Sequence, residues 1–100
     1  MRRRVVLRPA AEADIVAAAA WYEEQSLNAG AKFWRVVEAK LEFARDNPLQ
    51  YQALRGRYRR VLLHPFEYMV IYTFNDEELI VVGCMHGRRH PRRWQDRIRE

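Results

Sequence analysis

The chain has 100 residues, 49% of them hydrophobic, which is enough for one small domain with a limited core. Its one cysteine, Cys84, excludes a disulfide within the chain and suits a reducing cytoplasm. Apolar runs stay short of the ~18–20 residues that a membrane span needs, and Val5–Leu7 is too short for the ~7–15-residue apolar region of a secretory signal. We therefore expect a single cytoplasmic domain over residues 1–100, without a membrane segment.

The net charge of +5 is unevenly distributed along the sequence. Residues 10–47 carry four basic and seven acidic side chains, a net charge of −3, whereas the remainder carries fourteen arginines against six acids, a net charge of +8. Arginine suits bidentate contacts with carboxylates and phosphates. The pattern is compatible with an ordinary basic surface, and equally with a site for an acidic protein segment or a nucleic acid.

The first half of the chain predicts a short strand followed by two helices. Arg4–Arg8 reads as the strand, and Pro9 suits the start of a helix over Ala10–Gln25. A second helix is expected over Ala29–Arg45 and ends before Pro48, because proline disfavours helix in the residue that precedes it. Since only a few residues join the helices, we expect them to pack antiparallel. Apolar residues recur at helical spacing in both: Ala11, Ile15, Ala18, Ala19 and Tyr22, then Phe33, Val36, Val37, Leu41 and Ala44.

The second half predicts three strands, over Tyr58–Leu63, Glu67–Phe74 and Glu78–His86, after a connection over Leu49–Gly56. The links between the strands are short, which favours an antiparallel meander. The middle strand is apolar on both faces, so the helices can cover one face and the other needs a second cover. The region of Trp94 or a bound partner could provide that cover.

These elements predict the order β-α-α-β-β-β, followed by a tail that can form a short helix over Arg92–Arg99. The expected fold class is α+β: a small, twisted, mainly antiparallel sheet with an N-terminal α-helical hairpin packed on one face.

Several residues recur in an order and at a spacing that resemble a known superfamily. They are Ala11, Asp14, Ile15 and Tyr22 in the first helix; Gly30, Phe33 and Pro48 around the second; Leu54, Arg55, Tyr58, Arg59, Arg60, Phe66, Tyr68 and Tyr72 in the next segments; and Ile80, Val81, Val82, His86 and Arg89 at the end. Over nearly the whole chain the sequence resembles the RelE/ParE superfamily, the toxins of bacterial type II toxin–antitoxin modules. The resemblance implies a toxin that forms a hetero-oligomer with a cognate antitoxin, whose acidic, disordered C-terminal segment folds over it.

The superfamily contains two activities: RelE-like members cut mRNA in the ribosomal A site, and ParE-like members poison DNA gyrase. His86-Gly87-Arg88-Arg89, followed by Pro91 and Trp94, is more similar to the ParE-like and plasmid stabilisation branch. RNase-active members often carry an arginine shortly before the aromatic residue of the third strand, and a tyrosine after the last strand. Here Met69-Val70-Ile71 precedes Tyr72, and no tyrosine follows it. The resemblance therefore implies a gyrase-binding inhibitor rather than an enzyme, with an mRNA endoribonuclease, or a degenerate toxin that only binds its antitoxin, as alternatives.

Three sets of site residues follow from these hypotheses. The target-binding edge would consist of Arg88, Arg89, Arg92, Arg93 and Trp94. The antitoxin would contact Arg59, Arg60, Tyr68, Tyr72, Arg88 and Arg89, where an amphipathic acidic segment can add a helix or a strand across the sheet. If the chain is an RNase, His86 would be the base or acid, Arg59, Arg60 and Arg89 would stabilise the phosphorane, and Glu67 is a possible second carboxylate.

Each of these residues also has a structural interpretation. His86 can cap the end of its strand through a hydrogen bond, Trp94 can fold back and shield the sheet, and His64 can be a turn residue before Pro65. Cys84 is expected to be buried rather than nucleophilic, because it has no evident basic partner. His86 and His90 are four residues apart, but the glycine between them disfavours a helix, so we expect neither a metal site nor a cofactor.

Overall fold

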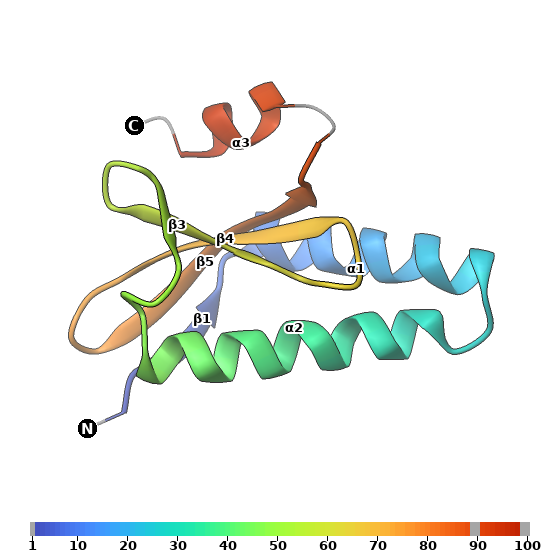
Figure 1. Ribbon diagram of the computed structural model, residues 1–100, viewed down its shortest axis with the longest axis horizontal. Helices are drawn as coiled ribbons and strands as arrows, with labels where there is room; N and C mark the ends of the chain where they lie inside the picture. The colour runs from blue at the N-terminus through green and yellow to red at the C-terminus, as the bar shows by residue number, and fades with distance from the viewer. Residues whose placement is uncertain (1, 89–90, 99–100) are drawn as a thin grey trace.

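The computed structural model describes residues 2–88 and 91–98 and forms two long helices, a short one and a five-stranded sheet (Figure 1). In chain order the elements are β1 (Arg4–Leu7), α1 (Pro9–Gln25), α2 (Ala29–Asp46), β2 (Gln52–Arg55), β3 (Tyr58–Leu62), β4 (Tyr68–Phe74), β5 (Glu78–His86) and α3 (Pro91–Arg97). The strands lie in the order β1-β5-β4-β3-β2, with β1 parallel to β5 and the other neighbours antiparallel. The predicted α+β class and the helical hairpin on one face are confirmed.

The two long helices pack through the apolar residues that their spacing predicts. Ala11, Ile15, Ala18 and Ala19 of α1 and Phe33, Val37, Leu41 and Ala44 of α2 are buried. The two helices approach closely at Gly30, where an added Cβ would lie 2.8 Å from the carbonyl oxygen of Ala19. The Glu23 carboxylate accepts hydrogen bonds from the backbone N–H groups of Asn28 and Gly30, both 3.0 Å long, and so satisfies donors at the start of α2.

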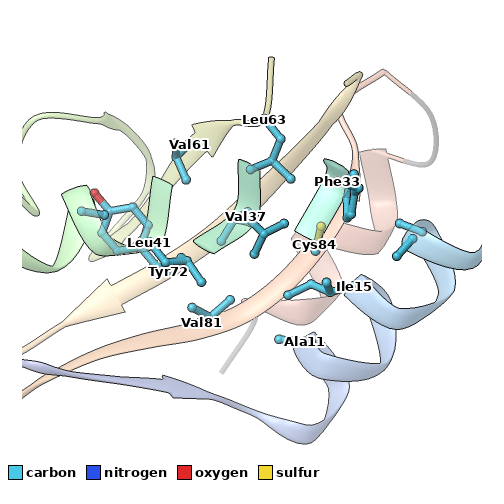
Figure 2. Packing of buried hydrophobic residues seen from close by; sticks show 14 of the residues in the cluster. Ala11, Ile15, Phe33, Val37, Leu41, Val61, Leu63, Tyr72, Val81 and Cys84 are labelled. Carbon is cyan, nitrogen blue, oxygen red and sulfur yellow. The ribbon is translucent and has the colours of Figure 1, made fainter. Parts of the chain in front are cut away.

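Side chains alternate along each strand, so they point to the two opposite faces of the sheet. One face packs against the helices and the other against α3. Val70 and Tyr72 of β4 and Val81 and Cys84 of β5 face the hairpin and join its buried residues in the larger core (Figure 2). The opposite side of the sheet buries Tyr58, Met69, Ile71, Val82 and Met85 together with Ile98, and Trp94 packs against that cluster. Of the two covers considered for this second face, the C-terminal segment is therefore the one present.

Strand β5 has a β-bulge at Val82 and contributes buried side chains to both faces of the sheet. Ile71 lies opposite Gly83 while its neighbour Tyr72 lies opposite Val81, so Val82 is an extra residue in the ladder. A Cβ at Gly83 would lie 3.2 Å from Nη1 of Arg97, which crosses the strand at this point. The missing side chain at Gly83 therefore makes room for the arginine of α3.

The segment expected to be a connection was predicted incorrectly, since Gln52–Arg55 forms the edge strand β2. It pairs with β3 through an irregular register and a turn at Gly56, whose φ of 56° suits glycine. Only two of its four residues are apolar, so its own sequence carries little strand signal. The other boundaries differ from the expected ones by a residue or two, and His64 and Pro65 lie in a turn as expected. Within the described part of the chain, no helix is long and apolar enough to cross a membrane.

Candidate functional site

Four of the predicted site residues, Arg60, Glu67, Tyr68 and Arg88, lie together where β5 ends and the β3–β4 connection turns. A groove of about 410 Å³, called here the β3–β5 groove, lies at this end of the sheet. Its lining consists of Arg60, Leu62, His64, Pro65, Phe66, Glu67, Tyr68, Gly87 and Arg88. Two of the predicted arginines, from segments distant in the sequence, thus face one depression beside an aromatic wall.

His86 forms hydrogen bonds at the end of β5, which supports its structural interpretation. Its Nδ1 accepts a hydrogen bond of 3.2 Å from the backbone N–H of Arg88, and its Nε2 lies 3.3 Å from Oε2 of Glu67. Because Nδ1 accepts a hydrogen bond, the neutral ring carries its proton on Nε2. This N–H group faces the Glu67 carboxylate as a hydrogen-bond donor. The ring also packs edge-on against Tyr68, with 5.5 Å between the centroids. Both nitrogens therefore have partners inside the protein.

Arg59 and Arg60, grouped in the sequence-based sets, lie on opposite faces of β3. Arg59 is paired with Tyr72 in the ladder and donates a 2.7 Å hydrogen bond to the backbone carbonyl of Tyr51 on the helix side. Arg60 faces the other side, where its guanidinium donates two hydrogen bonds to Oε1 of Gln52. Only Arg60 therefore lines the β3–β5 groove.

The two tyrosines assigned to the antitoxin surface also differ in exposure. Tyr72 is fully buried, and its hydroxyl donates a 2.5 Å hydrogen bond to the carbonyl of Pro48. Burial raises the pKa of Tyr72 to about 12. Tyr72 thus belongs to the core and is not available to a partner, which corrects its assignment to the antitoxin surface. Tyr68 is half-buried and lines the groove.

Helix α3 carries three of the predicted target-binding residues, Arg92, Arg93 and Trp94. Arg92 and Arg93 are exposed, whereas Trp94 is half-buried against the second face of the sheet, as its structural interpretation anticipated. Arg88 is exposed just before the helix. Arg89 and His90 lie outside the described residues.

The residue that anchors α3 is Asp14, to which sequence reasoning assigned no role beyond the resemblance. Its Oδ2 accepts hydrogen bonds from the backbone N–H of Cys84 and from Nη1 of Arg97, at 3.0 and 2.8 Å. The Asp14 side chain is 10% exposed, and Arg97 also donates to the carbonyl of Val82. The Asp14 carboxylate thus connects α1 with α3 and with the edge of β5, at a position beyond the end of β1. Asp14 and Arg97 are 83 residues apart, so the local sequence carries no signal for the ion pair between them.

An aromatic pocket that sequence reasoning missed lies next to the groove, with a volume of about 410 Å³ and a lining of Trp21, Tyr22, Pro65, Phe66, Glu67, Tyr68 and His86. Trp21 is 48% exposed, an unusual state for so large an apolar side chain. Its position on the side of α1 that faces His86 follows from the packing of the helix on β5. Cys84, in contrast, is buried, and burial raises the pKa of its thiol to about 12, which agrees with the expected inert role.

Comparisons with known proteins agree with this geometry. Residues 5–91 match the family described as "ParE toxin of type II toxin-antitoxin system, parDE". The chain is 26% identical over 92 residues to Toxin ParE2 of two Mycobacterium tuberculosis strains, CDC 1551 / Oshkosh and H37Rv, covering 91% of this chain and 88% of each relative.

Two solved structures share the fold at low sequence identity. The YoeB dimer from Staphylococcus aureus has a TM-score of 0.62 and 17% identity, covering 85% of this chain and 97% of that one. The chromosomal ParDE toxin–antitoxin system from P. aeruginosa has a TM-score of 0.59 and 13% identity, covering 85% and 96%. With the family match over most of its length, the chain belongs to the ParE toxin family of type II toxin–antitoxin systems, within the RelE/ParE superfamily.

Proposed function

We propose that this ParE-family toxin acts by inhibiting DNA gyrase and that its contact edge consists of Arg88 and helix α3. The exposure of Arg88, Arg92 and Arg93 beside the partly buried Trp94 supports this proposal. Arginines around an aromatic residue are typical of energetically important protein–protein contacts. Arg89, outside the described residues, would extend this edge. A gyrase target also places the protein in the cytoplasm.

We propose further that an antitoxin of the ParD type neutralises the toxin, since ParE toxins pair with ParD antitoxins in parDE systems. An acidic segment of the antitoxin would pair its carboxylates with Arg60 and Arg88, next to Tyr68. Charge steering of this kind predicts an association rate that falls as salt increases.

One observation favours a second candidate, a ribosome-dependent mRNA endoribonuclease. His86 and Glu67 lie beside the groove that Arg60 and Arg88 line, which brings an acid–base pair close to cationic groups. Against it, both nitrogens of His86 have partners, and the positions two and three residues before Tyr72 in β4 are the buried, apolar Val70 and Met69. An RNase would have to break the His86 contacts before this ring could accept a proton from a 2′-hydroxyl group.

A gyrase supercoiling assay with purified protein distinguishes these functions. The wild type is expected to inhibit supercoiling and to trap cleaved DNA, and the double variant Arg92→Gln/Arg93→Gln to lose at least tenfold in potency. Arg35→Gln is the matched control, because Arg35 is also an exposed arginine but lies on the helical hairpin. Absence of inhibition at a large molar excess would refute the gyrase proposal for the enzyme tested, and cleavage of ribosome-bound mRNA by the same sample would establish the second candidate.

A further inference from the structure

Carboxylates neutralise some of the described arginines around the sheet and leave others unpaired. At the N-terminal end, Arg2 pairs with Asp46 at 2.8 Å and Arg4 pairs with Glu78 at 2.7 Å. Among the described residues no carboxylate forms an ion pair with Arg60, which bonds only to the neutral amide oxygen of Gln52, or with Arg88. The lining of the β3–β5 groove therefore contains two arginines without an ion-paired carboxylate in the described part of the chain, against the single carboxylate of Glu67, and stays net positive.

Further exposed positive charge lies on α3. Arg92 and Arg93 of α3 follow Arg88 closely in the chain, and Arg93 is 58% exposed and lies 4.0 Å from the Asp14 carboxylate. The helical hairpin, by comparison, carries a net charge of −3. This separation gives the molecule a positive end, which would turn toward a polyanion and keep the acidic hairpin away from it.

From these features we infer that the β3–β5 groove and the adjoining arginines of α3 bind the phosphate backbone of double-stranded DNA. The inference rests on the proposed gyrase target, because gyrase presents the toxin with DNA as well as protein. Arginine forks match phosphate oxygens, and backbone contacts require no base-specific geometry. The proposed gyrase target supplies duplex DNA, and RNA, which carries the same phosphate groups, is the competing ligand in the test below.

One group in the groove opposes an anion, and it provides a test of opposite sign. Glu67 is 66% exposed at the rim of the groove, with His86 3.3 Å from its carboxylate. The negative charge of this carboxylate repels phosphate. Neutralising Glu67 should therefore strengthen DNA binding, whereas neutralising either groove arginine should weaken it. A purely structural role for these residues would not produce effects of opposite sign.

The experiment is fluorescence anisotropy of a labelled 20-base-pair DNA duplex titrated with the full-length protein at 50 and at 200 mM salt. If Arg60, Arg88, Arg92 and Arg93 each neutralise one phosphate, affinity should fall by about 100-fold between the two salt concentrations. Arg60→Gln and Arg88→Gln should each weaken binding several-fold and reduce the slope of log affinity against log salt by about one. Glu67→Gln should tighten binding, and Arg35→Gln should leave it within twofold of the wild type.

Two outcomes would overturn the inference: equal effects of Arg60→Gln and Arg35→Gln, or tighter binding of single-stranded RNA of the same sequence than of the duplex. The gyrase assay separates this inference from the function on which it rests. A wild type that does not bind the duplex but still traps cleaved DNA would refute the DNA groove and leave the gyrase proposal intact. A wild type that binds duplex with the expected salt slope but never inhibits gyrase would refute the gyrase target alone.

Discussion

Replacing Asp14 by alanine should detach α3 from the sheet and destabilise the whole domain. The substitution leaves the Cys84 N–H without its acceptor and removes the carboxylate from Arg97. A neutral hydrogen bond contributes about 1 kcal/mol and a charge-assisted one about 1.5–3 kcal/mol. Breaking a fully buried ion pair costs about 3–5 kcal/mol, but the Arg97 side chain is 24% exposed and can turn to water once α3 moves. We therefore expect a loss of about 2–3 kcal/mol for Asp14→Ala.

Two further variants separate the hydrogen bond from the charge. Asp14→Asn keeps a carbonyl oxygen for the Cys84 N–H and loses only the charge, so the expected cost is about 1–2 kcal/mol. Arg93→Gln is the control, because Arg93 lies 4.0 Å from the same carboxylate and is 58% exposed. An exposed pair of this kind is worth about 0–1 kcal/mol. The structure thus predicts the order Asp14→Ala, Asp14→Asn, Arg93→Gln from the largest to the smallest loss of stability.

Urea unfolding followed by helical circular dichroism measures these differences. With a urea dependence of about 1–2 kcal/mol per molar, typical of a small domain, the midpoint for Asp14→Ala should fall by roughly 1–3 M. Amide exchange provides the local readout: the Ile98 N–H, which donates to the Trp94 carbonyl, should exchange faster in this variant than the amides of α2 do. If Asp14→Ala unfolds within about 0.5 kcal/mol of the wild type, Asp14 does not anchor α3 and the reasoning fails.

Two other variants test the core and the helical hairpin. Tyr72→Phe should cost about 1–3 kcal/mol, because the buried carbonyl of Pro48 loses its donor. The folded-state pKa of Tyr72 is raised to about 12 from 10.0, so its neutral form stabilises the fold below pH 10 and this stability is lost as pH rises from 10 through 12. Alkaline unfolding curves should therefore show a smaller loss of stability in Tyr72→Phe than in the wild type. Identical curves would contradict this assignment. Gly30→Ala should lower the thermal midpoint by several degrees, because its Cβ would lie 2.8 Å from the Ala19 carbonyl oxygen. Gly87→Ala is the control and should change the midpoint much less, since its Cβ would lie 3.7 Å from the nearest atom. Equal midpoints for the two variants would show that the hairpin can relax around the methyl group.

The candidate site was only partly readable from the sequence. Within the run from His86 to Trp94, Arg88, Arg92 and Arg93 are exposed, as is expected of a basic segment that follows an apolar strand. The opposite faces of Arg59 and Arg60 follow from the two-residue period of a strand, and that signal was present in the sequence. The aromatic pocket at Trp21 carried no such signal, because it depends on how α1 lies over the end of β5.

The sequence by itself determined the helices, four of the five strands of the sheet to within a residue at each end, and the two apolar faces of β4. These features depend on residue spacing within short segments, and a period of 3.6 or 2 is visible without any knowledge of the rest of the chain. Only the tertiary structure decided that Gln52–Arg55 forms a strand, that β1 lies parallel to β5, and that Asp14 holds α3 through Arg97. The physical reason is that these contacts satisfy backbone groups and charges left over by distant segments, and which groups remain unsatisfied is decided only once the whole sheet has assembled.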